Sequence, residues 1–160
     1  MMMPENQYFL DTTVLIDYFC KDNAPEFENV RKWFDSVLTQ PEDTIYTNTI
    51  ILLEFAKFLF YQKMSKKKIR DTVRRLSSQY NLECVGFDKS DLFTTIEEFE
   101  TLPLSPPCDV GELSLLPLRT RFNCIYVSSD DGALTTFKHI DRINPRKSKL
   151  VCAKGTDYIK

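Results

Sequence analysis

Short apolar runs alternate with longer amphipathic stretches along this sequence, and the alternation limits the fold more than any other feature. The short runs are rich in β-branched and aromatic residues, as is typical of strands, whereas the longer stretches repeat their apolar residues at helical spacing. Expected strands are residues 8–10, 44–47, 82–87, 124–129 and 149–154, and expected helices are residues 14–19, 26–38, 50–61, 65–80, 89–102, 109–116 and 133–137. Strands that alternate with helices form a mostly parallel sheet with right-handed crossovers. We therefore expect a three-layer α/β/α fold, with residues 149–154 as a strand at the sheet edge.

The composition narrows the classes of function. At 160 residues the chain fits a single domain, residues 1–160, which is long enough to bury a core. The net charge of −2 provides no general attraction to nucleic acids or membranes. His139 is the only histidine, which argues against Ser-His-Asp, Cys-His and multi-histidine metal chemistry. Any catalysis is therefore expected to depend on carboxylates.

The sequence also indicates a compartment. No apolar run approaches the roughly 20 residues that cross a membrane, and the first residues lack the basic flank and apolar stretch of a secretion signal. The five cysteines are scattered and lack the spacing of a zinc ribbon or a disulfide framework. Free thiols are typical of a reducing compartment. We expect a cytoplasmic protein that makes no contact with a membrane.

Acidic residues follow the expected strands at matching places. Asp11 ends the first strand and Asp130 ends the fourth, while Glu54 lies in the helix after the second strand and Glu112 in a helix that precedes the fourth. The carboxyl ends of parallel strands share one edge of a sheet, so these acids are expected to meet. Clustered carboxylates need a cation to neutralise them, and Mg²⁺ or Mn²⁺ prefers oxygen ligands. Such a site can activate water for attack on a phosphodiester.

Several assignments within this acidic set stay open. Glu54 can also be explained as an exposed residue on a mostly apolar helix. Asp109 precedes Glu112 by three residues and shares its helix face, so either could be the direct metal ligand, although the spacing from Asp130 favours Glu112. Asp131 could hold a second metal ion. Pro117 is expected to kink or shorten the helix after Glu112.

Candidate substrate contacts come from two kinds of residue. Thr12 and Ser128 adjoin the acids and could position a ligand or a phosphate, or simply cap the next helix. Lys66, Lys67 and Arg70 belong to a strongly basic helical stretch. Such a stretch is usually a solvated face, but it could also contact phosphates.

Four segments resemble, in chain order, the motifs of PIN domains, the fold of the VapC-type toxin ribonucleases. Residues 9–16, Phe-Leu-Asp-Thr-Thr-Val-Leu-Ile, look like the first motif, and residues 49–59 with Glu54 are similar to the second. Residues 109–112, Asp-Val-Gly-Glu, resemble the D-x-G-E variant of the third motif, and residues 127–131 look like the fourth. Each motif alone is weak, but the ordered set spans nearly the whole chain.

The resemblance implies a Mg²⁺- or Mn²⁺-dependent ribonuclease that hydrolyses RNA with a metal-activated water. It implies an RNA substrate, an antitoxin protein as partner, and a homodimer. The implied catalytic metal ligands are Asp11, Glu54, Glu112 and Asp130, with Asp109 and Asp131 as further metal ligands and Thr12, Ser128, Lys66, Lys67 and Arg70 as substrate contacts.

Two other functions are compatible with parts of this pattern. A catalytically degenerate PIN-like domain would bind RNA or protein, and its acids would be ordinary polar residues at loop ends. A haloacid-dehalogenase-like phosphatase also begins with a strand that ends in Asp, but its motif needs a second acid two residues later. Thr13 stands at that position, which argues against the phosphatase.

Overall fold

A single sheet organises the protein. In the computed structural model, which describes residues 6–19, 22–79, 81–101, 109–122, 124–130, 141–147, 149–151 and 157–159, the sheet has seven strands in the order β3-β2-β1-β4-β5-β6-β7. The strands are β1 (Gln7–Leu10), β2 (Thr44–Asn48), β3 (Leu82–Val85), β4 (Ile125–Val127), β5 (Arg142–Asn144), β6 (Lys149–Val151) and β7 (Asp157–Ile159). All pairings from β3 to β5 are parallel, and β6 and β7 add antiparallel strands.

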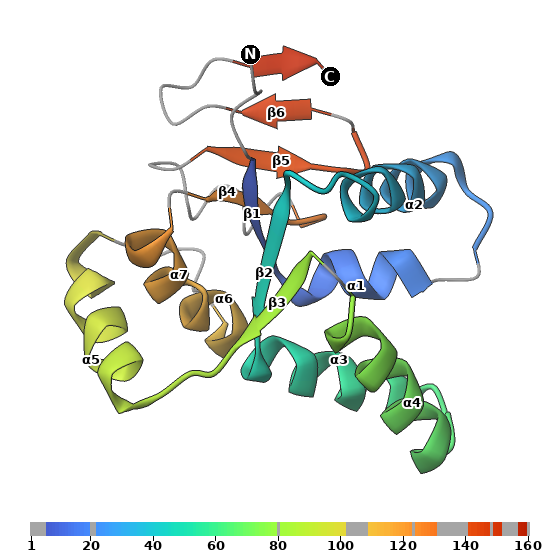
Figure 1. Ribbon diagram of the computed structural model, residues 1–160, viewed down its shortest axis with the longest axis horizontal. Coiled ribbons are helices and arrows are strands. Elements are labelled where there is room, and N and C mark those ends of the chain that lie inside the picture. Colours follow the sequence, from blue (N-terminus) through green and yellow to red (C-terminus); the bar gives the residue numbers. More distant parts are fainter. Residues whose placement is uncertain are drawn as a thin grey trace.

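Helices lie on both sides of this sheet (Figure 1). They are α1 (Thr12–Phe19), α2 (Pro25–Leu38), α3 (Thr49–Tyr61), α4 (Lys66–Ser77), α5 (Lys89–Glu97), α6 (Val110–Ser114) and α7 (Leu116–Arg121), with a 3-10 turn η1 (Glu98–Thr101). The structure confirms the expected α/β fold with a mostly parallel central sheet. Among the helices described, none combines the length and the apolar character needed to cross a bilayer.

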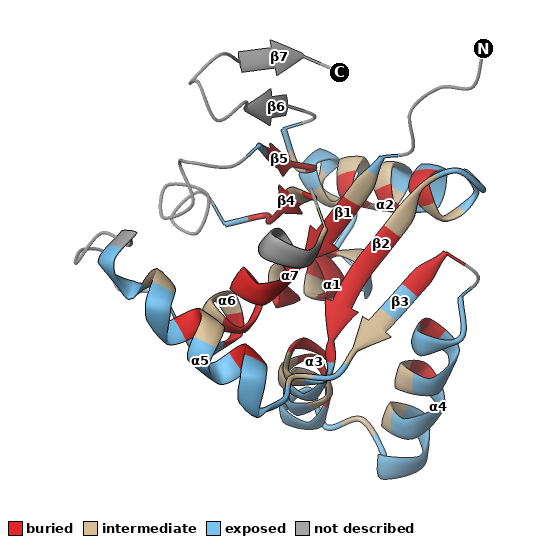
Figure 2. Cartoon of the chain, turned by 60° about the vertical axis from the view of Figure 1, so that its left-hand side comes forward, coloured by how far each residue is buried: buried red, intermediate tan, exposed pale blue. Residues whose placement is uncertain are grey.

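β1 lies between two parallel neighbours and is buried on both faces (Figure 2). Phe9 pairs with Tyr46 of β2 and with Tyr126 of β4. Tyr8, Phe9 and Leu10 are each at most 2% exposed. A central parallel strand covered by helices has no solvent face, which explains why β1 is a continuous apolar run rather than an alternating one.

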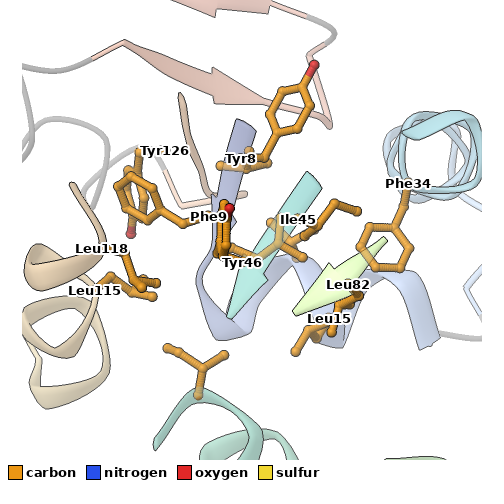
Figure 3. Packing of buried hydrophobic residues seen from close by; sticks show 14 of the residues in the cluster. Tyr8, Phe9, Leu15, Phe34, Ile45, Tyr46, Leu82, Leu115, Leu118 and Tyr126 are labelled. Atoms are coloured by element: carbon orange, nitrogen blue, oxygen red, sulfur yellow. The ribbon is translucent and has the colours of Figure 1, made fainter. Parts of the chain in front are cut away.

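The core is continuous through the sheet (Figure 3). On one face the rings of Phe9 and Tyr126 lie 5.0 Å apart, and Leu115 packs nearby. Leu15 and Phe34 come from the helices of the other side. Burial of each such side chain contributes about 1.5–3 kcal/mol to the free energy of folding, relative to leaving it exposed. This packing fixes the positions of the strand ends.

The C-terminal part of the sheet differs from the sequence-based expectation. The strand expected over residues 149–154 exists as β6, but it is not at the edge, because β7 pairs with its outer side. β5 and β7 were not predicted from the sequence. The helix expected over residues 133–137 lies outside the described residues. Pro117 has the predicted effect: α6 ends at Ser114 and α7 begins with proline in its first turn, where the missing N–H costs nothing.

Asn48 connects two helices at the carboxyl edge of the sheet. Its Oδ1 accepts a hydrogen bond from Ile51 N at 2.8 Å and so caps α3. Its Nδ2 donates to the Ser114 carbonyl at 3.1 Å and to Ser114 Oγ at 3.0 Å. Asn48 is 2% exposed. This one side chain therefore holds the start of α3 against the end of α6.

Replacement of Asn48 by alanine should be costly. We expect Asn48→Ala to lower the free energy of unfolding by about 2–3 kcal/mol, because it removes a helix cap and leaves a buried carbonyl without its partner. Urea denaturation measures the change. Ser65→Ala is the matched control, since Ser65 caps α4 at an exposed position and should cost only about 0.5–1 kcal/mol. Equal losses in the two variants would contradict the proposed connection.

Candidate active site

The order of the strands brings two distant segments together. The chain moves outward from β1 to β2 and β3 and then returns to β4 on the other side of β1. Open α/β sheets bind ligands at such a reversal, beyond the carboxyl ends of the strands. Asp11 follows β1 there, and its backbone N–H donates to the Val127 carbonyl of β4 at 3.2 Å. Asp11 therefore lies beside the segment that carries Asp130.

Asp11 is buried and held by hydroxyl groups. Its Oδ1 accepts from the Thr13 backbone N–H at 2.9 Å and from the Thr13 hydroxyl, and its Oδ2 accepts from Tyr126 at 2.9 Å and from Ser128 at 2.6 Å. Asp11 is 3% exposed. Burial raises the Asp11 pKa to about 6, although these hydrogen bonds act to lower it. The hydrogen bonds hold the carboxylate in one orientation, and burial makes its negative charge unfavourable.

The same hydroxyls order the loop after β4. Ser128 Oγ accepts from the Asp130 backbone N–H at 3.1 Å, and Thr13 Oγ1 accepts from the Ser129 N–H at 3.0 Å. Asp130 itself is exposed. Ser128 thus donates to the Asp11 carboxylate and accepts from the Asp130 backbone N–H. These two hydrogen bonds fix the backbone of Asp130 relative to Asp11.

Glu54 faces α6 and the start of α1. Thr12 Oγ1 donates to Glu54 Oε2 at 2.8 Å, and Glu54 is half-buried. A Cβ atom built at Gly111 would overlap the Glu54 carboxyl group. The carboxylate occupies the space that a side chain at position 111 would fill, so Glu54 is not simply an exposed residue of α3.

Asp109 and Glu112 have different positions at the start of α6. Asp109 is the exposed N-cap, and its Oδ1 accepts from the Glu112 backbone N–H at 2.8 Å. Burial, followed by the charges of Asp109, Asp11 and Asp130, raises the Glu112 pKa to about 7. Glu112 is therefore within electrostatic reach of three other acids. Such clusters with raised pKa values are typical of functional sites.

The structure separates the basic helix from these acids. Lys66, Lys67 and Arg70 are exposed on α4, which packs against α3 and β3, whereas α6 packs against α3 from another side (Figures 1 and 2). Asp131, which was also predicted as a metal ligand, lies outside the described residues.

Sequence reasoning missed three contributors to the site: Thr13, Tyr126 and Gly111. Tyr126 and Ser128 both contact Asp11, and their spacing of two residues is the strand period, which could have indicated Tyr126. Thr13 follows Asp11 at the spacing of a side-chain-to-backbone turn. The contact between Gly111 and Glu54 has no local sequence signal.

The donor atoms fit a hard divalent cation. Every candidate ligand is a carboxylate, which is the ligand type that Mg²⁺ and Mn²⁺ prefer. Burial is the main cause of the raised Glu112 pKa, and the charges of Asp109, Asp11 and Asp130, which a cation would offset, add to it. The side chains, however, are not arranged around a single metal position. Within the described part of the chain, no three His, Cys, Asp or Glu side chains are placed so that they could hold one metal ion.

The raised pKa of Glu112 predicts a pH dependence of stability. A carboxyl group whose pKa rises from 4.5 to about 7 on folding binds its proton more tightly in the folded state. Stability is therefore highest below about pH 4.5 for this group and is lost as the pH rises to about 7. We expect Glu112→Gln, which cannot ionise, to become progressively more stable than the parent over this interval.

Melting temperatures measured in EDTA across this pH range test the expectation. Glu42→Gln is the control, because Glu42 is exposed in a loop and its replacement should leave the pH profile unchanged. Parallel profiles for the parent and Glu112→Gln would show that folding does not raise the Glu112 pKa.

Comparison with known proteins agrees with this geometry. The model of the PIN domain family matches residues 8–109, a span that includes Asp11 and Glu54 and ends at Asp109. No curated protein matches the chain in sequence at a significant level.

Similar solved structures include VapBC2 from Rickettsia felis bound to a DNA fragment from its promoter, with 15% identity, a TM-score of 0.58, and coverage of 82% of this chain and 93% of that chain. FitAcB from Neisseria gonorrhoeae has 15% identity and a TM-score of 0.57, and the match covers 86% of this chain and 97% of that chain. At this identity the likeness concerns the fold. Since the family match extends over most of the chain and includes the strand that ends in Asp11, this protein belongs to the PIN domain family.

Proposed function

We propose that this protein is a Mg²⁺- or Mn²⁺-dependent ribonuclease. The observation that carries the proposal is the gathering of acids at the strand reversal, where Glu112 has a pKa raised to about 7 by burial and by Asp109, Asp11 and Asp130. Repulsion of this kind is maintained in proteins where a cation relieves it. Membership of a family whose members are generally nucleases supports the same conclusion.

The proposed ligands of the cation are Asp11, Glu54, Glu112 and Asp130, with Asp109 and Asp131 as further ligands. A bound divalent cation supplies charge stabilisation and lowers the pKa of water at such a site. The substrate is RNA, and Lys66, Lys67 and Arg70, on a helix that does not adjoin the acids, are candidate contacts to phosphates away from the cleaved bond.

The residues around the acids prepare the site. Thr13, Tyr126 and Ser128 fix the Asp11 carboxylate, and Thr12 fixes Glu54. Groups held in place before the substrate arrives lose little entropy during the reaction. The hydroxyls of Thr12 and Ser128 thus act on the acids, and a direct contact with the scissile phosphate is a further proposal for them.

Asp11→Asn tests the proposal. The amide oxygen can keep the hydrogen bonds from Thr13, while the hydroxyl protons of Tyr126 and Ser128 lose their acceptor. The substitution also removes a buried charge that is unfavourable, which offsets this loss, so the melting temperature should not fall. We expect cleavage of a mixed RNA to need Mg²⁺ or Mn²⁺, to stop in EDTA, and to fall at least about 100-fold in this variant. Asp71→Asn, at an exposed position of α4, is the control and should cut like the parent. Parental activity in Asp11→Asn would remove Asp11 from the reaction.

A second candidate is a non-catalytic PIN-like module that binds RNA or protein. Two observations favour it: the absence of a preformed three-ligand metal site among the described residues, and the engagement of both Asp11 oxygens in hydrogen bonds. Under this alternative the protein would bind RNA in EDTA and leave it intact when Mg²⁺ or Mn²⁺ is added. The cleavage assay therefore distinguishes the two functions.

We further propose an antitoxin protein as partner. VapBC2 and FitAcB share this fold, and two strongly exposed apolar side chains, Leu53 at 71% and Val110 at 70%, adjoin Glu54 and Gly111. An amphipathic partner helix could cover these side chains and direct a basic residue toward the acids. The expected homodimer stays a prediction, which the mass from sedimentation tests.

The partner is expected in a neighbouring reading frame, as a short protein with a DNA-binding start and an apolar tail. Co-expression should yield a complex in which RNA cleavage is suppressed, and Leu53→Asp should weaken the complex at least about tenfold. Tyr61→Asp is the matched control, since Tyr61 is 69% exposed at the other end of α3. Equal effects of the two variants would contradict the proposed surface.

A further inference from the structure

A separate pocket opens beside the acids. Its volume is about 310 Å³, and its lining residues are Thr13, Ile16, Asp17, Ser129, Asp130 and Arg146. Thr13 and Asp130 are shared with the acidic site, since the Thr13 hydroxyl bonds to Asp11 and Asp130 follows Ser128. The pocket is at the lower end of the range for small-molecule sites, about 300–1,000 Å³. A ligand in this pocket would lie next to any group bound at Asp11.

Arg146 forms a rigid wall of this pocket. Its Nε donates to Asp17 Oδ2 at 2.6 Å and its Nη2 to Asp17 Oδ1 at 2.8 Å, and its Cζ lies 4.8 Å from the centre of the Phe27 ring. The Arg146 backbone is also fixed, by the side chains of Asn144 at 3.0 Å and Asn29 at 2.9 Å. The guanidinium is therefore ordered before any ligand binds, which reduces the entropy lost on binding.

Arg146 is the more exposed partner of the Asp17–Arg146 pair. The Arg146 side chain is 34% exposed and the Asp17 side chain is 5% exposed. A bidentate arginine is suited to planar partners, by hydrogen bonding at its edge or by stacking on its face.

Ser129 supplies a second sign that the pocket receives a ligand. Ser129 is 9% exposed, and its Oγ is buried without a hydrogen-bond partner in the part of the chain that the structure describes. Buried hydroxyl groups without partners are uncommon. Because Ser129 lines the pocket, a polar atom of a bound ligand would give this hydroxyl a partner.

The charges of the lining select the class of ligand. Among the lining residues that the structure describes, the carboxylates of Asp17 and Asp130 outnumber the guanidinium of Arg146, so a bare phosphate would meet more negative than positive charge from them. A neutral group with both donors and acceptors can pair with the exposed Asp130 carboxylate and with the guanidinium, and Ile16 offers its flat face an apolar contact. In RNA these properties belong to the nucleoside, whose base is read through its edges or stacked when unpaired.

We propose that this pocket binds the nucleoside next to the cleaved phosphodiester, with Arg146 as the residue that contacts its base. The inference rests on the proposed ribonuclease function. Arg146 is then a positioning residue that sets which bond of a single strand lies at the acids. Bases within a duplex are stacked and cannot enter, so unpaired RNA is the substrate class.

Binding of a short fluorescein-labelled single-stranded RNA, measured by anisotropy in EDTA so that cleavage does not interfere, tests the proposal. In a series of RNAs that each lack one base, removal of the base at one position should weaken binding to the parent about fivefold or more. Arg146→Gln should bind the intact and the base-lacking RNA equally. Arg31→Gln, which also removes one positive charge but lies on α2 beside Glu28, should keep the full difference.

The ratio of the two affinities separates this role from a structural one. If Arg146→Gln lowers the affinity for both RNAs by the same factor and keeps the ratio, Arg146 only supports the fold and the proposal is wrong. It is equally wrong if no position in the series affects binding to the parent, or if RNA does not bind. Failure of the ribonuclease proposal is seen separately, as absence of cleavage with Mg²⁺ or Mn²⁺.

Discussion

Burial of the Asp11 carboxylate is the constraint on which the rest of the site depends. Removing a charge from water is unfavourable unless hydrogen bonds replace those of the solvent. For Asp11 these bonds come from Thr13 at the start of α1, from Tyr126 in β4 and from Ser128 after β4. The three donors lie together only because β1 and β4 are neighbours, so the strand order and the position of the acid depend on each other.

Glu54 and Glu112 are placed by contacts between helices rather than by the sheet. Asn48 attaches the first turn of α3 to Ser114 at the end of α6. Glu54 lies one turn further along α3, and Glu112 lies within α6. The positions of Glu54 and Glu112 therefore depend on the packing of the core, because Ile51 of α3 and Leu115, which follows α6, are fully buried. A change in that packing would move both acids.

Much of this arrangement could be predicted from general rules, and the exceptions have physical causes. Asp11 and Asp130 follow strands of a parallel sheet, and the rule for strand ends places them. β5 and β7 have the sequences Arg-Ile-Asn and Asp-Tyr-Ile, so neither has the run of apolar residues that marks β4, Ile-Tyr-Val. Arg146 was not found because its partner Asp17 is 129 residues away in sequence, and only the folded chain brings them together. The contact between Glu54 and Gly111 depends on the packing of two helices, which no local pattern encodes.

The close approach of Glu54 to Gly111 has an evolutionary consequence. The carboxyl group and a methyl group cannot occupy the same volume, so a side chain at position 111 requires the flexible end of Glu54 to move from its place beside Thr12. A shorter acid at position 54 would vacate the space that alanine at position 111 requires. Homologous sequences should therefore contain either glutamate with glycine or aspartate with a small side chain, and a family in which glutamate and alanine regularly occur together would have to carry its acid in a different rotamer.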